Sequence, residues 1–565
     1  MPTRHDVTSV PLQGGYVAKQ CPVRAQNDAI VPGEPLPPSS FQERLFKGGN
    51  DFEAEVFAEL ISLHPDAVVI GAEVHGPESE AATLAAMQGE AALILGGRLP
   101  ADEVGRRLGK PDILVRARSG GYRVVDVKGH MNLEPARGTA SEFPGLCSPL
   151  RTPAYEVAAV DADFAAKKKE SDLLQLAHYQ RMLEAHGLGA TDGRWSGIIG
   201  TERRVVWYDL DAPLKRTPST TEGTKVRSTM ERYDFEFNFR LDIIAVAEQH
   251  RADPSIPLLT VPVKIGECES CPWWGHCGPI LDAAPGDISL LPRVGWKEWK
   301  FHHDRGVTNR AELAALDLTH DAERYAGMSQ VALHEQIDQA RAAVGADPAY
   351  RRRGIDSLTV PRADVEVDID MENVETGCYL WGCLVTDRSA AGDASSKYRP
   401  FATWAPMTPD VEAANSLQFW RWLMSMRSQV TSGGRTFRAY CWNAGAENTY
   451  LRRLGLANGL ADEVEGFIAS ESWVDLLDVW NRQIITGHGS GLKVIAPIAG
   501  FHWGVEDAGG GESMIRYDLA AAGDDAAQEW LLRYNRGDVE ATLAVREWMA
   551  TAALQGIGDC VAPVA

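Results

Sequence analysis

An acidic and a basic residue lie two positions apart in the segment "YRVVDVKGHM" (122–131). Its run of apolar residues predicts a β-strand, and a strand directs side chains two positions apart toward the same face. Asp126 and Lys128 should therefore share a face. An exposed pair of this kind is usually a surface ion pair that contributes little. Its meaning depends on which other side chains the fold brings beside it.

A second aspartate comes just before this strand in the chain. The segment "GKPDILVR" places Asp112 at the start of a predicted strand, and a turn at "SGG" leads back to Asp126. Two neighbouring strands would let both carboxylates hold a hard divalent cation, with the carbonyl of Val127 as a further ligand. The cation would activate water and stabilise charge on a phosphate. Lys128 would position or deprotonate that water, or offset charge in the transition state, and Glu53, on a preceding helix, would complete the site.

A second group of acids lies in the C-terminal half. The segment "EVDIDMEN" contains Asp370 and Glu372, which share one face of a predicted apolar strand, as two ligands of the same metal ions must. Glu447 opens a predicted helix after the strand "RAYCWN". Tyr534 and Asp538 lie four residues apart on one face of a later helix. The two acids on the strand predict a second metal site.

Cysteines indicate a third centre. The chain has nine, and three of them, Cys268, Cys271 and Cys277, form a C-x2-C-x5-C array in "CESCPWWGHC". This spacing suits thiolates that converge on one metal centre, and a fourth ligand is then needed. Cys21 is the candidate. A structural zinc site that uses His276 fits the same spacing.

The elements that must position these residues belong to several domains. A chain of 565 residues predicts roughly two to four domains. The net charge of −22 argues against nonspecific coating of nucleic acid through overall charge, but it leaves room for a local basic groove. The N-terminus has no apolar signal core, and no run of about 18 apolar residues is present. We therefore expect a cytoplasmic protein without a membrane partner.

The fold class expected is α/β, with two α/β domains joined by a helical connector. The first domain should begin with a helix and continue through strands and a helix to the cysteine array. The second begins near residue 363, with two strands, a helix, a strand and further helices. The expected parts are an N-terminal arm with a cluster cysteine (1–40), the first α/β domain with the cysteine array (41–282), the connector (283–358), the second α/β domain (359–553) and a tail (554–565).

The first domain resembles the PD-(D/E)XK nuclease superfamily in its RecB-like branch. The resemblance implies a restriction-endonuclease-like fold and a nuclease site. A further match is "QLAHY", which gives Gln175 and Tyr179 one helical turn apart. By the resemblance, these two side chains contact the nucleic-acid strand near the metal. The catalytic residues that match the branch are Glu53, Asp112, Asp126 and Lys128.

One position departs from that branch. Its frequent histidine before the first glutamate is Phe52 here, and Glu55 and Glu59 lie close by in the sequence. The simpler interpretation of the individual motifs is an ion pair on an edge strand and a polar helix surface. The four catalytic residues in the expected order favour the nuclease.

The cysteine pattern also resembles a known group. One distant upstream cysteine and three clustered downstream cysteines are similar to the iron–sulfur nucleases, among them the CRISPR-associated RecB-like exonucleases. The resemblance implies a [4Fe–4S] cluster, and zinc stays the alternative. Such a centre would connect the N-terminal arm to the end of the first domain, closing a long loop of the chain. The four ligands would be Cys21, Cys268, Cys271 and Cys277.

The second domain resembles the DEDD exonucleases of the RNase H-like superfamily. That family combines D-x-E, N-x-x-x-D and Y-x-x-x-D motifs. The resemblance implies that Tyr534 orients the attacking water, while two Mg²⁺ or Mn²⁺ ions stabilise the attacking and leaving oxygens. The metal ligands would be Asp370, Glu372, Glu447 and Asp538.

Two positions in this domain depart from the family or offer alternatives. Glu447 replaces the aspartate of the second motif, and its extra methylene displaces the carboxylate. Asp368 continues the face of Asp370 as an alternative ligand. Asp475 is expected to be a helix-start acid. A degenerate domain that only binds nucleic acid is therefore an alternative to a second active nuclease.

The whole arrangement resembles bacterial RecB-like nucleases that join an iron–sulfur nuclease to an RNase H-like domain. It implies a Mg²⁺- or Mn²⁺-dependent exonuclease that hydrolyses single-stranded DNA, or DNA with free ends, in repair or processing. RNA is an alternative substrate, and a helicase an expected partner. The competing hypothesis is a catalytically weak nucleic-acid-binding adaptor that docks a helicase.

Overall fold

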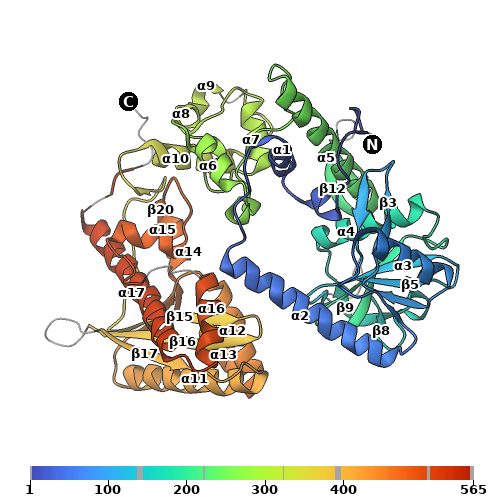
Figure 1. The fold of residues 1–565 in the computed structure, drawn as a ribbon. Helices are drawn as coiled ribbons and strands as arrows, with labels where there is room; N and C mark the ends of the chain where they lie inside the picture. The colour runs from blue at the N-terminus through green and yellow to red at the C-terminus, as the bar shows by residue number, and fades with distance from the viewer. Residues whose placement is uncertain are drawn as a thin grey trace. The chain divides into compact units, whose positions relative to one another are not determined.

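The computed structural model describes residues 3–136, 144–219, 223–321, 323–388, 396–505, 510–555 and 557–559. It has the mixed α/β fold predicted from the sequence, with several sheets (Figure 1). The chain divides into two compact units. Unit 1 comprises 1–37, 42–262 and 269–273, and unit 2 comprises 38–41, 263–268 and 274–565. Among the described residues, no helix is both long and apolar enough to cross a membrane.

A nine-stranded sheet forms the centre of unit 1, in the order β1-β2-β5-β6-β10-β11-β8-β9-β7. Strands β5 and β6 are antiparallel neighbours near its middle, as expected from the turn between them. Every residue of β6 is buried, which explains its nearly continuous apolar sequence. The strands are β1 (Val68–Val69), β2 (Leu93–Leu95), β5 (Ile113–Arg116), β6 (Tyr122–Val127), β7 (Leu133–Pro135), β8 (Pro144–Pro149), β9 (Ala159–Ala166), β10 (Trp195–Ile199) and β11 (Arg204–Asp209).

Helices cover both faces of this sheet. Val56 and Leu60 of α2 pack against Val125 and Val127 on one face, while α4 and α5 share the core of the other face with Val124. The helical elements are η1 (Gly15–Lys19), α1 (Pro22–Ile30), α2 (Ser40–Leu63), α3 (Gly76–Gln88), η2 (Tyr155–Val157), α4 (Glu170–Ala185), α5 (Thr229–Ala252) and η3 (Gly266–Ser270). Two hairpins complete the unit, β3 (Leu99–Asp102) with β4 (Arg107–Gly109) and β12 (Pro213–Ser219) with β13 (Gly223–Ser228).

Unit 2 begins with short helices around an apolar core of their own, in which Trp299, Leu313 and Ile337 are buried. They fill most of the predicted connector. A two-stranded pairing of β14 (Tyr350–Arg351) with β20 (Ile484–Ile485) follows. The helices are α6 (Trp274–Asp282), η4 (Ile288–Leu290), α7 (Trp296–His303), α8 (Arg310–Ala314), α9 (Leu318–Asp321) and α10 (Gln330–Val344).

The main sheet of unit 2 has five strands in the order β17-β16-β15-β18-β19. Strands β15 to β17 are antiparallel, and β18 and β19 run parallel to β15. The strands are β15 (Val365–Val374), β16 (Gly377–Asp387), β17 (Ser396–Ala402), β18 (Phe437–Cys441) and β19 (Trp473–Asp475). The helices are α11 (Pro409–Ser432), α12 (Gly445–Asn458), α13 (Ala461–Ile468), α14 (Leu476–Gln483), α15 (Leu492–Ile495), η5 (Ala496–Ala499), α16 (Gly510–Ala521) and α17 (Asp525–Gln555).

Candidate active sites

One face of strand β15 carries a row of four carboxylates. Acidic residues occupy alternate positions, and the pleat of a strand directs alternate side chains to one face. The intervening Val367 and Ile369 join the apolar core that includes α11. Helix α17 contacts the strand and supplies partners for the acids. The row consists of Glu366, Asp368, Asp370 and Glu372.

Arginine neutralises the first two acids of the row. Arg546 of α17 is fully buried, and its guanidinium contacts both Glu366 and Asp368, with Nη2 2.6 Å from Asp368 Oδ2. Arg362 also contacts Glu366, with its Nε 2.9 Å from Glu366 Oε1. Buried carboxylates persist where such partners satisfy them. Asp368, the alternative metal ligand, is therefore an arginine partner and is not part of the metal-ligand group described next.

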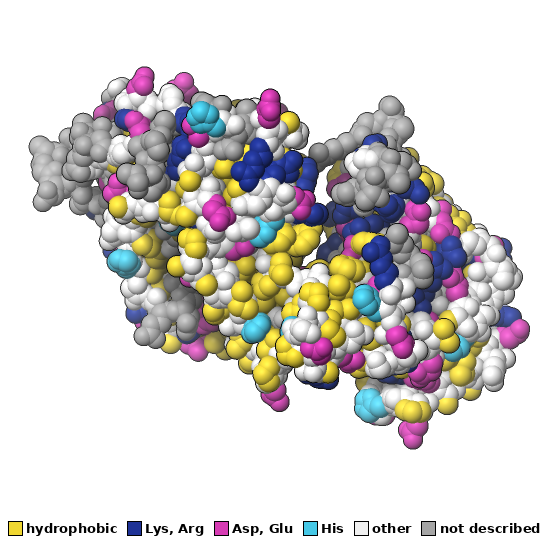
Figure 2. Space-filling view, turned by 90° about the horizontal axis from the view of Figure 1, so that it is seen from above, with side chains coloured by type: hydrophobic (Ala, Val, Ile, Leu, Met, Phe, Trp, Pro, Cys, Tyr) yellow, Lys and Arg dark blue, Asp and Glu magenta, His cyan; other side chains and the backbone are white. Residues whose placement is uncertain are grey.

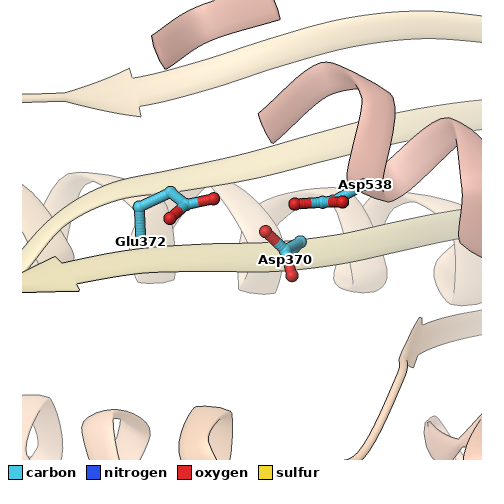
Figure 3. Close-up of side chains that lie close together, drawn as sticks. All are labelled: Asp370, Glu372 and Asp538. Carbon is cyan, nitrogen blue, oxygen red and sulfur yellow. The ribbon is translucent and has the colours of Figure 1, made fainter. Parts of the chain in front are cut away.

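The other two acids meet a third from α17. Asp370, Glu372 and Asp538 each offer one carboxylate oxygen, and these three oxygens all lie within 4.8 Å of one another. Figure 3 shows the carboxylates of the strand directed toward that of the helix. Among the described residues, this is the one group of three or more His, Cys, Asp or Glu ligands with that spacing. Three of the four predicted ligands thus come together.

Burial and mutual repulsion hold protons on this cluster. Burial, followed by the charges of Asp538 and Glu372, raises the pKa of Asp370 well above its ordinary value. Burial and Asp538 raise the pKa of Glu372 to about 8, and burial raises that of Asp538 to about 6. Three ionised carboxylates so close together are unfavourable without a cation. A divalent cation would replace the protons.

Neutral donors orient the cluster. Asn535 Nδ2 donates to Asp370 Oδ2 at 2.9 Å, and Trp503 Nε1 donates to Asp538 Oδ1 at 2.8 Å. Gly382, opposite Asp370 on β16, makes room for the asparagine, because a Cβ there would lie 1.6 Å from Asn535 Oδ1. Neither donor was predicted from the sequence. Asn535 follows the tyrosine of the third motif, whereas Trp503 lies in no motif.

Tyr534 lies beside the cluster with a lysine that the sequence analysis also missed. Lys493 Nζ donates to the Tyr534 hydroxyl at 2.7 Å and lies 4.3 Å from the centre of the tyrosine ring. Burial lowers the pKa of Lys493, although the charges of Asp538 and Glu372 oppose this shift. The lysine therefore places one positive charge beside an acidic site and fixes the tyrosine hydroxyl.

Glu447 stands apart from the three acids. It is buried on the first turn of α12, and its Oε2 accepts no hydrogen bond from the described residues. Burial raises its pKa to about 8. Its charge contributes to the raised pKa of Asp370, so the two are neighbours, but Glu447 is not in the group of three.

Asp475 is the N-cap of α14, as expected, and accepts a hydrogen bond from the amide of Ala444 at 3.0 Å.

The predicted acids of unit 1 also meet. Asp126 is fully buried on β6, and Asp112 Oδ2 accepts the amide of Val127 at 2.7 Å. Lys128 Nζ lies 2.6 Å from Asp126 Oδ2, yet neither oxygen of Asp126 accepts a well-oriented hydrogen bond from the described residues. A buried carboxylate with unused acceptor capacity is suited to a cation.

Electrostatic coupling links Glu53 to this pair. Burial, Asp126 and Glu53 together raise the pKa of Asp112 well above its ordinary value. Burial also raises the pKa of Glu53. Although burial opposes it, the charges of Asp126 and Asp112 raise the pKa of Lys128. A protonated Lys128 favours positioning of water over its deprotonation. The carboxylate oxygens of Glu53, Asp112 and Asp126 do not all lie within 4.8 Å of one another, unlike those of the three acids in unit 2.

The predicted helical pair borders the same site. Gln175 Nε2 donates to the Tyr179 hydroxyl at 3.0 Å, and both side chains are buried. Gln175 Oε1 accepts from Lys128 Nζ at 3.4 Å and from Lys19 Nζ at 2.9 Å. Burial, followed by the charge of Lys128, lowers the pKa of Lys19 to about 8. Lys19 lies in the N-terminal arm and was not predicted to belong to the site.

The predicted cysteine ligands are distributed over both units, with Cys21 and Cys271 in unit 1 and Cys268 and Cys277 in unit 2. Within unit 1, the arm contacts the segment around Cys271, since Trp273 Nε1 donates to Asp28 Oδ1 at 2.7 Å. Within unit 2, Cys268 Sγ accepts the amide of Ile265 at 3.4 Å. A four-cysteine centre stays a prediction.

Comparison with known families identifies part of the chain. A family model described as the RNase H superfamily matches residues 365–550, from β15 into α17. This part is therefore an RNase H-like domain, a class that points to nuclease-type hydrolysis of phosphodiester bonds and to nucleic acid as ligand. Such folds typically use Mg²⁺ or Mn²⁺, and the three-acid group fits them. No curated protein and no solved structure matches the chain.

Proposed function

We propose that the protein is a Mg²⁺- or Mn²⁺-dependent exonuclease that acts on single-stranded DNA or DNA ends during repair or processing. The observation that carries the proposal is the group of Asp370, Glu372 and Asp538, whose oxygens converge within an RNase H-like domain. Although the net charge is −22, Lys and Arg side chains gather in patches on one face (Figure 2). Such patches would attract a phosphate backbone.

At the unit 2 site, the three acids would hold the metal ions. When bound, the ions activate water and stabilise charge on the phosphate. Asn535 and Trp503 keep the carboxylates in place, because each donates to one of them. Tyr534, fixed by Lys493, would orient the attacking water. Glu447 would assist only if it moved toward the group, which makes it the weakest of the proposed ligands.

At the unit 1 site, we propose a RecB-like PD-(D/E)XK nuclease. Asp112 and Asp126, assisted by Glu53, would hold one metal ion, and the charge of Lys128 would stabilise the transition state. The contact between Lys128 and Asp126 supports this role. Gln175 and Tyr179 would bind the nucleic-acid strand. The support is the convergence of all six residues on one end of β6.

We further propose that Cys21, Cys268, Cys271 and Cys277 bind a [4Fe–4S] cluster. The amide donated to Cys268 Sγ suits a thiolate ligand, because such hydrogen bonds stabilise cluster sulfurs. The cluster would connect the arm to the cysteine array. Anaerobically purified protein should be brown and absorb at roughly 400 nm. Colourless protein that contains zinc would overturn the iron–sulfur proposal in favour of a structural zinc site.

A second function is favoured by the position of Glu447, outside the group of three. The protein would then be a catalytically weak nucleic-acid adaptor that docks a helicase. Metal-dependent digestion of labelled single strands separates the two functions. If the wild type cleaves no faster than an Asp126→Ala, Asp370→Ala double variant, the adaptor is correct. The single variants, tested on DNA and RNA labelled at either end, would assign substrate and polarity to each site.

A further inference from the structure

The N-terminal arm brings a lysine into the unit 1 site. The arm's short helix η1 is fixed in the core, because Val17 and Ala18 are buried in the same cluster as residues of α4 and α5. Gly15 lies so close to α4 that an added Cβ would meet the ring of His178 at 3.3 Å. Arg240 of α5 donates to the carbonyl of Gln20 at 2.8 Å. The residues that precede and follow Lys19 in the chain are therefore both held by packing, and this sets the position of the lysine.

In the described part of the chain, the groups in direct contact with the Lys19 ammonium are neutral, although the charges of Asp172 and Asp126 act on it from farther away. Lys19 Nζ donates to Gln175 Oε1 at 2.9 Å and lies 4.0 Å from the centre of the Tyr16 ring. Among the described residues, no carboxylate oxygen lies within 4.0 Å of this nitrogen, whereas Lys128 is paired with Asp126. Gln175 Oε1 is shared by the two ammonium groups. Two ammonium groups that share one amide oxygen would be stabilised by an anion nearby, because charge-assisted hydrogen bonds are stronger than those to a neutral amide.

We propose that Lys19 binds the phosphate backbone of the nucleic-acid strand, beside the phosphate cleaved at Asp112 and Asp126. The proposal depends on the proposed nuclease function of unit 1. A backbone phosphate would accept a charge-assisted hydrogen bond from Lys19, in place of the weaker contact with the amide of Gln175. Lys19 would thus be a substrate-binding residue supplied by a segment outside the nuclease motifs.

The test uses Lys19→Met, which keeps the apolar stem and removes the charge, in the full chain with Asp370→Ala to silence unit 2. Cleavage of a labelled single-stranded oligonucleotide should show KM raised about 5- to 10-fold and kcat nearly unchanged, the range expected for one lost charge-assisted contact. Lys19→Arg should restore most of the affinity. Arg116→Gln, which removes a cation at the other end of β5, should leave KM unchanged.

Salt dependence separates binding from a structural role. Anisotropy of the same oligonucleotide in Ca²⁺ should give a log K against log salt slope that is smaller by about 0.7 in Lys19→Met. An unchanged slope and KM would overturn the proposal for Lys19, as would a purely kcat effect. If the Asp370→Ala parent shows no metal-dependent cleavage, the unit 1 function itself fails, and the Ca²⁺ binding slope still decides whether Lys19 contacts phosphate.

Discussion

The acidic sites of the two units differ in where positive charge lies. In unit 1, Lys128 contacts Asp126 directly, and Lys19 approaches through Gln175. In unit 2, neutral side chains orient two of the three acids, and Lys493 binds the tyrosine hydroxyl. Unit 2 thus has more unbalanced negative charge for divalent cations. In the proposed nuclease site of unit 1, Lys128 would supply positive charge beside the phosphate.

Strand β15 shows the same difference within one element. Its first two acids are paired with Arg546, whereas its last two face Asp538 on the same helix. Strand periodicity alone makes all four equivalent. The side chains of the packing helix decide which acids stabilise the fold and which are available to a metal.

Replacement of Arg546 should have the largest effect, and it acts on stability. Arg546→Met leaves Asp368 buried without its arginine partner, whereas Glu366 keeps Arg362, and this should lower the free energy of unfolding by about 3–5 kcal/mol. Denaturant unfolding of the purified protein measures this. Arg536→Met removes an exposed arginine ten residues earlier on the same helix and should cost little. A loss below about 1 kcal/mol for Arg546→Met would contradict the assignment of a buried ion network.

Removal of a unit 2 ligand should abolish most cleavage by that site. Asp370→Asn keeps the shape of the side chain but removes its charge, and should reduce cleavage by at least about 100-fold. The rate is measured in an Asp126→Ala background, so that unit 1 does not contribute. Glu540→Gln, which changes a half-exposed acid on α17, is the matched control. Equal rates for the two variants would show that the three-acid group is not catalytic.

The pH dependence of metal-free protein should reveal the crowded acids. The folded pKa of Asp538, about 6, exceeds its usual value near 3.8, so the folded state holds the proton more tightly. Its contribution to stability is therefore complete below about pH 4 and is lost as pH rises through 6, on the order of 2 kcal/mol. Thermal unfolding in EDTA should show this decline, and Mg²⁺ should reverse it. Asp538→Asn should flatten the profile; an unchanged profile would argue against the cluster.

The smallest effect is expected at Glu447. Because it lies outside the group of three, Glu447→Gln should reduce cleavage by less than about 10-fold, equivalent to less than about 1.4 kcal/mol of barrier. The assay and background are those used for Asp370→Asn. A loss as large as that of Asp370→Asn would show that Glu447 joins the metal site when substrate binds. Glu447→Asp then tests whether the shorter acid of the wider family works better.

The sequence predicted the principal residues of both candidate sites better than the side chains that contact them. Two-residue spacing on a strand placed Asp126 with Lys128 and Asp370 with Glu372, because strand geometry is local. The order of motifs in the resembling family added Asp538. The family match confirms an RNase H-like domain at residues 365–550, and its assignment to the DEDD exonucleases stays a prediction. The PD-(D/E)XK resemblance and the iron–sulfur cluster stay predictions.

Other partners could not be predicted because no local pattern marks them. Arg546 is 180 residues from Glu366, and only the packing of α17 on β15 brings them together. Lys19 reaches Gln175 across 156 residues. Lys493 and Trp503 come from segments without a motif. Such contacts depend on tertiary packing, which sequence spacing does not record.

Helix α17 limits how this domain could lose its proposed activity during evolution. The same helix carries Asp538, Asn535 and, two turns later, Arg546. A premature stop codon upstream of Arg546 would unfold the domain instead of leaving an inert binding module. An inactive descendant that keeps its fold would therefore arise by point substitution at the site residues. In a collection of natural sequences, Arg546 should persist even where Asp538 has been lost.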